Sequence, residues 1–170
     1  MTITLSSASL PGIIKMLSNL SHLLAKAEQF VEQKKCDPNA LTQYRLAPDM
    51  FPLTKQVFVA CDMAKNGMAR ISGLEAPKFD DSETTFEQLR ERIQKTLDFL
   101  VSIPSSTVDG KEENEITFPV GPTTRTMKAQ AYLVHWILPN MYFHITTVYN
   151  ILRHNGVEIG KRDFLAGESA

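Results

Sequence analysis

Few side chains in this 170-residue sequence combine a reactive type with a useful spacing, and His144 is the best placed of them. It follows the apolar helical repeat of Met141 and Val148, which predicts that its side chain points inward. Asn140 stands one turn earlier, and helical bundles build metal sites from side chains three or four residues apart. A lone histidine on an apolar face is also typical of a neutral core residue bonded to a carbonyl or hydroxyl. Both roles therefore stay open for His144.

A second group of candidates lies within residues 56–62. Gln56, Cys61 and Asp62 are the polar or soft side chains expected nearest the buried side of the helix there. Nothing near Cys61 argues for a lowered thiol pKa, so we expect it to pack as a small apolar group. Asp62 has the chemistry to pair with a cation across the molecule, and Arg153 is one candidate. We expect a structural ion pair there.

Established catalytic motifs are missing from the sequence. It contains no His-Glu-x-x-His, Glu-x-x-His or His-x-His pair, so no self-sufficient zinc or di-iron ligand set is present. It also has no glycine-rich phosphate loop and no nucleophile elbow. The catalytic residues, if there are any, are not identified by motif.

Four amphipathic helices must position these candidates. Apolar residues recur at steps of three and four along four segments, which predicts helices over about 10–35, 49–72, 85–103 and 127–154. A capping box of Thr84 and Glu87 is expected at the start of the third helix. The pattern predicts an all-α four-helix bundle, one domain spanning residues 1–170.

The remaining segments connect or cover the helices. Residues 105–125 carry turn signals and a short β-prone piece at 116–118, which predicts a long crossover with at most a small hairpin. Pro139 falls inside the last helix and is expected to kink it. Residues 157–170 are too few for a domain, so we expect a C-terminal docking tail in which Phe164 packs.

Composition excludes several classes of function. Eighteen Lys and Arg stand against nineteen Asp and Glu, a balance that argues against a nucleic-acid partner. No run approaches the roughly 18 apolar residues of a membrane span, so we expect no membrane partner. Cys36 and Cys61 match no C-x-x-C spacing, which favours free thiols and a cytoplasmic location.

Several short strings along the chain are distinctive. They are RLAPDM (45–50), QV with ACD (56–57 and 60–62), LPNMYFH (138–144), LRHNGV (152–157) and GKRDF (160–164). Together they resemble a bacterial domain-of-unknown-function family within the DinB/YfiT-like superfamily. The resemblance covers nearly the whole chain and is specific for that family.

The resemblance implies a DinB-like four-helix bundle with a long crossover, a cytosolic location and commonly a homodimer. Typical superfamily members are metalloenzymes with three inward histidines, one on the second helix and two spaced i, i+4 on the fourth. His144 matches the last of these, whereas Asn140 and Gln56 stand where the other two are implied. Because amide oxygens are weak ligands for zinc, we expect no metal cofactor, with zinc or nickel as the alternative.

Two classes of function remain. The first is a metal-free protein, either a structural homodimer or one that binds a small polar ligand in a remnant pocket around Gln56, Asn140 and His144. The second is an enzyme, for example for thiol transfer or hydrolysis. It would use a weak metal at His144 with Asp62 or Cys61, or His144 alone as a general base.

Overall fold

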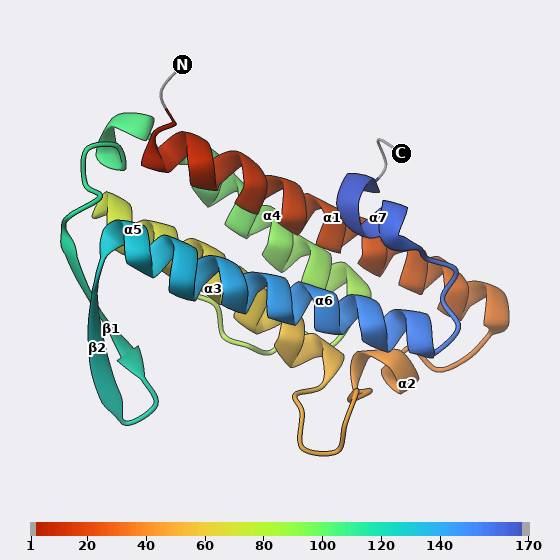
Figure 1. The fold of residues 1–170 in the computed structure, drawn as a ribbon. Coiled ribbons are helices and arrows are strands. Elements are labelled where there is room, and N and C mark those ends of the chain that lie inside the picture. Colours follow the sequence, from red (N-terminus) through yellow and green to blue (C-terminus); the bar gives the residue numbers. More distant parts are fainter. Residues whose placement is uncertain (1–2, 168–170) are drawn as a thin grey trace.

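Four long helices build the molecule, which a computed structural model describes over residues 3–167. The helices lie side by side in one bundle (Figure 1), so the predicted all-α four-helix bundle is confirmed. They are α1 (Leu5–Lys34), α3 (Leu53–Ser72), α4 (Phe86–Ser102) and α6 (Leu138–His154). The other helical elements described are short. They are helices α2 (Asn39–Thr42), α5 (Ala129–Tyr132) and α7 (Lys161–Ala166), the 3-10 turn η1 (Ser105–Thr107) and the π-helical segment η2 (Leu133–Ile137).

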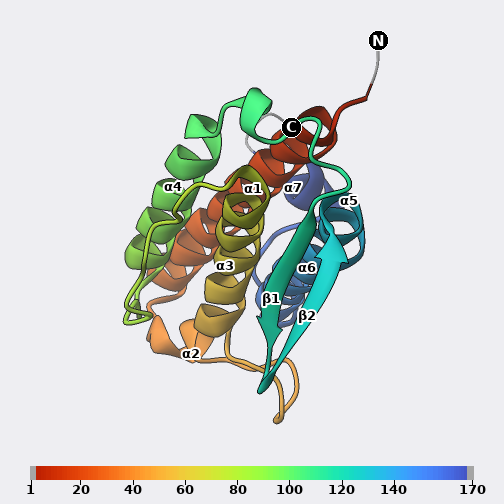
Figure 2. The ribbon, with the colours of Figure 1, turned by 90° about the vertical axis from the view of Figure 1, so that its left-hand side faces the viewer.

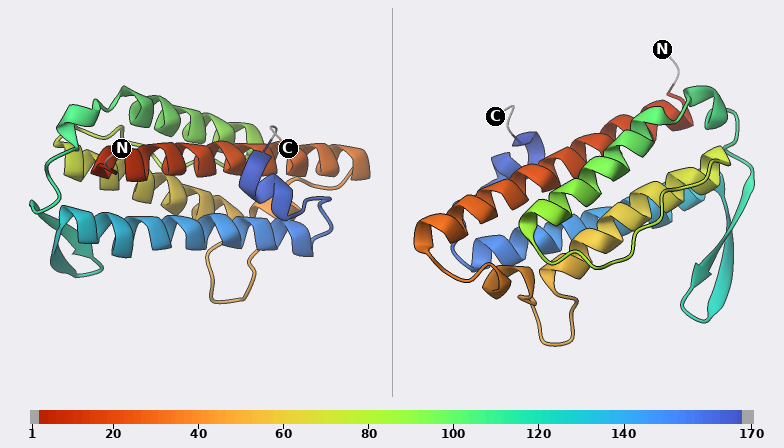
Figure 3. Two further views of the ribbon diagram at one scale, coloured as in Figure 1. Left: turned by 45° about the horizontal axis from the view of Figure 1, so that its top comes forward. Right: turned by 180° about the vertical axis from the view of Figure 1, so that it is seen from behind.

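The order of packing places α3 between α4 and α6, while α1 closes the bundle against α4 and α6. Helices α3 and α4 run in the same direction, so the connector of residues 73–85 returns along the length of the bundle (Figure 3, right). No helix within residues 3–167 has the length and apolar character to cross a membrane.

A β-hairpin fills the predicted crossover between the third and fourth long helices, which confirms this part of the predicted fold. Strands β1 (Glu115–Val120) and β2 (Thr123–Lys128) pair antiparallel and extend beside α5 (Figure 2). Phe118 anchors the hairpin because its ring centroid lies 4.4 Å from that of Tyr132 and 5.2 Å from that of Trp136. The β2 side chains remain largely exposed.

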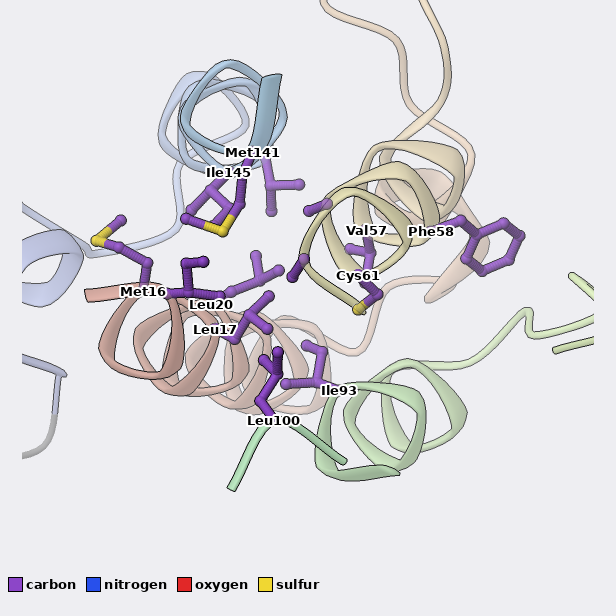
Figure 4. Close-up of a cluster of buried hydrophobic side chains, with 14 of the residues drawn as sticks. Met16, Leu17, Leu20, Val57, Phe58, Cys61, Ile93, Leu100, Met141 and Ile145 are labelled. Carbon is purple, nitrogen blue, oxygen red and sulfur yellow. The ribbon is translucent and has the colours of Figure 1, made fainter. Parts of the chain in front are cut away.

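The core sits where the inward stripes of the long helices meet. Figure 4 shows Leu17, Val57, Ile93 and Met141 converging from four helices, and each is at most 1% exposed. Leu97 follows the apolar repeat of α4, which predicts a core position, but it is only partly buried at the edge of this core.

Helix ends differ from the sequence expectations because local caps decide them. Helix α1 begins at Leu5, where Thr4 forms a capping box with Ser7, and continues through Pro11. Helix α4 is capped by Thr85 with Gln88, one residue later than expected. Residues 49–52 precede α3 rather than begin it, and residues 127–128 belong to β2.

The GKRDF string forms the docked helix α7. Asp163 accepts hydrogen bonds from Lys26 Nζ at 2.8 Å and His22 Nε2 at 3.2 Å, so both side chains tie α7 to α1. Burial by itself would raise the pKa of Asp163, but hydrogen bonds from Lys26, the Gly160 N–H and His22 hold it well below its ordinary value. Part of the expected tail, residues 168–170, lies outside the described residues.

Candidate functional site

His144 and Gln56 meet between α6 and α3. Nδ1 of His144 lies 2.6 Å from Oε1 of Gln56, and the two residues are only 8% and 1% exposed. The apolar stripes direct both side chains inward, since each stands among buried neighbours on its own helix. Two candidates that are 88 residues apart in the sequence therefore share one hydrogen bond.

A second hydrogen bond fixes the orientation of the Gln56 amide. Its Nε2 donates to the Phe51 carbonyl oxygen at 3.0 Å. A carbonyl oxygen can only accept, so Oε1 must be the amide atom that faces His144. Nδ1 of His144 must then carry the proton and donate it to Oε1, which leaves the lone pair of the neutral ring on Nε2.

Nε2 of His144 is the atom that remains available for chemistry. Nε2 has no hydrogen-bond partner among residues 3–167. It is also not one of the four fully buried side-chain atoms there that lack a partner. Nε2 is therefore part of the small fraction of the His144 ring that is exposed. Burial lowers the pKa of His144 below its ordinary value of 6.5, so the ring is neutral at pH 7 and Nε2 is an acceptor.

Asn140 does not bond to His144. Its Nδ2 donates to the Trp136 carbonyl oxygen at 2.7 Å, one turn back on its own chain. The π-helical segment η2 ends just before this point, and Pro139 lacks the N–H that a regular helix would use. The irregularity expected at Pro139 therefore lies in the preceding turn, where the Asn140 side chain adds a hydrogen bond to the Trp136 carbonyl.

Cys61 and Asp62 belong to another part of the molecule. Asp62 pairs with Arg92 at 3.0 Å and with Lys65 at 3.2 Å, so the expected structural ion pair is confirmed, but the candidate cation Arg153 is wrong. Cys61 is fully buried beside this group, and burial raises the pKa of its thiol to about 12. Neither side chain is in a position to complete a site with His144.

The most buried charge, that of Arg92 on α4, was not predicted as a special residue. Its side chain is 1% exposed, and it also pairs with Asp81 at 2.8 Å and Glu83 at 3.2 Å. Its guanidinium lies between the rings of Phe58 and Phe79, with centroids at 4.4 and 4.5 Å. Because Asp81, Glu83 and Phe79 belong to the connector, Arg92 fastens residues 73–85 to the bundle.

The donor atoms around His144 do not fit a metal centre. Across residues 3–167, no three His, Cys, Asp or Glu side chains are grouped so that they could share an ion. One imidazole nitrogen and amide groups are a poor match for the closed nitrogen and sulfur sets that hold zinc. The Gln56 Oε1 is moreover engaged with the Nδ1 proton of His144.

Comparison with known proteins places the chain in a family. A family model described as a domain of unknown function, DUF1993, matches residues 5–165. A crystal structure of a DinB family member protein from Shewanella denitrificans is 43% identical in sequence with a TM-score of 0.89, covering 95% of this chain and 92% of that one. No curated protein matches the chain. The chain therefore belongs to the DUF1993 family, a DinB-like family of unknown function.

Proposed function

We propose that this protein is a metal-free DinB-like binding protein that presents Nε2 of His144 to a small polar ligand. The observation that carries the proposal is the hydrogen-bond chain from the Phe51 carbonyl through Gln56 to His144. This chain holds the ring in one tautomer and directs an acceptor atom outward. The matching ligand carries a hydroxyl, amine or amide N–H that donates to Nε2.

The same chain argues against a metal at this position. A zinc or nickel ion bound at Nε2 would have one imidazole ligand, because Gln56 is engaged with Nδ1 and Asn140 with its own helix. Stable protein sites for these ions need three or four such ligands. We therefore expect only weak binding of the ion.

Metal analysis of purified, untagged protein tests this proposal. After incubation with zinc or nickel and desalting, we expect far less than one ion per chain. The control variant is His135→Ala, which removes an exposed histidine. One ion per chain that is lost in His144→Ala but kept in His135→Ala would overturn the metal-free proposal and support a metal-dependent enzyme.

A second candidate function, general base catalysis, is favoured by the lowered pKa of His144. An unprotonated Nε2 at neutral pH can take a proton from a bound hydroxyl or thiol, and Gln56 Oε1 would stabilise the resulting imidazolium. With p-nitrophenyl acetate as the probe, this function predicts turnover above that of free imidazole which is lost in His144→Gln. Turnover equal to that of free imidazole would count against it.

We further propose a homodimer that covers apolar side chains near this site. Phe51, Tyr142 and Phe143 are 50%, 39% and 56% exposed, more than is usual for large apolar groups without a partner. Light scattering at micromolar concentration should report a dimer, and Phe143→Ser should weaken it. A monomeric wild-type protein would contradict this proposal.

We place the protein in the cytoplasm. Cys36 is exposed and Cys61 is buried, and both are free thiols, which suits a reducing compartment. Cell fractionation that finds the protein in an oxidising compartment would refute this location.

A further inference from the structure

A pocket of about 340 Å³ lies where α1, α4 and the end of α7 meet. Three of its lining side chains, Lys15, His22 and Arg90, are basic, and none of the lining residues within 3–167 is acidic. Asp163 and Glu28, which do not line the pocket, pair with His22 and Arg90. Hydroxyls of Ser18 and Ser21 also line it. A concave site of this size that has cationic donors, and no carboxylate among its described lining residues, is suited to a small anion.

The basic groups retain unused hydrogen-bonding capacity. Nη2 of Arg90 binds Glu28 at 2.5 Å, and its Nε is buried without a partner among residues 3–167, so a ligand would meet the exposed part of the guanidinium. Nζ of Lys15 donates to the Ala166 carbonyl oxygen at 2.9 Å, the one hydrogen bond it makes within residues 3–167, and an ammonium group has three protons to donate. An oxyanion in the pocket would meet both a guanidinium and an ammonium group.

Helix α7 forms one end of the pocket. Nδ2 of Asn19, a residue only 1% exposed, donates to the Phe164 carbonyl oxygen at 2.8 Å. Together with Lys15, it binds the last carbonyls of α7 and so fixes Ala166 and Gly167 at the rim. The pocket is thus built by tertiary contacts rather than by a loose surface loop.

A second pocket on α4, of about 360 Å³, has a different lining. Arg92, Lys78 and Lys95 line it together with three acids, Asp80, Glu83 and Glu91. Because the described lining of the pocket between α1, α4 and α7 has basic groups without acids, it is the better candidate of the two for an anion.

We propose that the pocket between α1, α4 and α7, centred on Lys15 and Arg90, binds the oxyanion group of a small molecule, a phosphate or a carboxylate. The site shares no residue with the Gln56–His144 pair and does not depend on the function proposed for it. Its ligand is recognised by charge and by the paired donors of a guanidinium.

Isothermal titration at constant ionic strength, with inorganic phosphate and malonate as separate probes, tests the site. We expect saturable binding of at least one of the two, and whichever binds identifies the class. Binding should weaken about tenfold or more in Arg90→Met and in Lys15→Met, since each removes a charge-assisted hydrogen bond. Arg90→Lys, which keeps the charge but loses the planar fork, should fall between Arg90→Met and the wild type.

Two control variants complete the test. Lys95→Met removes an exposed cation from the same helix but from the other pocket, and should bind like the wild type. His144→Gln should also bind phosphate or malonate like the wild type. A failure of the pocket proposal can therefore be distinguished from a failure of the function proposed for His144. Absence of saturable binding of both probes, or equal weakening in Lys95→Met and Arg90→Met, would overturn the proposal.

Discussion

At His144, one chain of hydrogen bonds decides which ring nitrogen carries the proton. The Phe51 carbonyl orients Gln56, and Gln56 Oε1 accepts the proton on Nδ1. In many catalytic sites a carboxylate accepts the Nδ1 proton and fixes the tautomer of the histidine. Here a glutamine has that role, and it adds no negative charge. The ring therefore stays neutral under conditions in which a His–Asp pair would favour the imidazolium.

The lowered pKa of His144 predicts a pH-dependent contribution to stability. Its folded-state pKa lies below the ordinary value of 6.5, so the unfolded chain binds more protons once the pH falls below that value. The free energy of unfolding should therefore decrease as the pH falls from about 6.5 towards the folded-state pKa, and this contribution should be absent at higher pH. Urea unfolding at pH 7.5 and 5.5 measures the difference.

The variant His144→Gln should show a smaller loss of stability between these two pH values than the wild type. His135→Gln, at an exposed position, serves as the control and should behave like the wild type. An identical pH dependence in all three proteins would show that His144 is not held neutral.

Arg92 carries a second prediction at the scale of one residue. Replacing it with Met removes the cation that Asp62, Asp81 and Glu83 share, while Lys65 still pairs with Asp62 and Lys55 with Asp81. Because these carboxylates stay partly exposed, we expect the free energy of unfolding to fall by about 1–3 kcal/mol. Lys95→Met, on an exposed part of the same helix, should change it by less than about 0.5 kcal/mol. Equal urea midpoints for the two variants would contradict this role.

At the scale of elements, one glycine lets α3 and η2 approach each other closely. A Cβ added at Gly67 of α3 would lie 2.5 Å from Ile137 Cδ1 of η2. Gly67→Ala should therefore destabilise the fold by about 1–3 kcal/mol through overpacking. Gly12 of α1 has no atom within 4 Å of its added Cβ, so Gly12→Ala should stabilise the protein by about 0.4–1 kcal/mol. Thermal unfolding that ranks the two variants in the opposite order would contradict this packing.

The long helices were predictable from the sequence because the regular spacing of apolar residues shows which face of each helix is buried. Val57 and Met141 are fully buried, as their stripes indicate. Leu97 follows the same spacing of apolar residues on α4 but lies at the edge of the core. The spacing alone does not show how far each neighbouring helix extends. The exact helix ends were harder to predict. Thr84 and Thr85 are both suitable N-caps for α4, and the sequence did not show that Thr85 is the one used.

Contacts made by the connectors were not predictable in the same way. Arg92 falls on the buried side of α4, but its partners Asp81 and Glu83 lie in a segment without periodicity. An ion pair of Asp62 was accordingly predictable, but its cation, Arg92, was not. The spacing of His144 predicted an inward side chain, whereas the orienting role of the Phe51 backbone carbonyl has no signal in the side-chain sequence.

At the scale of the whole molecule, the bundle keeps a DinB-like architecture, and we propose that the chemistry at its inward histidine has changed. The family match and the 43% identical DinB structure support the scaffold. Helices α3 and α6 bring Gln56 and His144 together much as bundle helices bring metal ligands together. The account proposed here is that this geometry now presents a hydrogen-bond acceptor.

Long-range nitrogen NMR of the His144 ring in ¹⁵N-labelled protein tests this central claim most directly. At pH 7.5 the account predicts a neutral ring with the proton on Nδ1, an unprotonated Nε2, and no change on adding one equivalent of zinc. In Gln56→Leu the preference for Nδ1 should be lost, because the acceptor that selects it is gone. A proton on Nε2 in the wild type, or an Nε2 signal that shifts with one equivalent of zinc, would contradict the account.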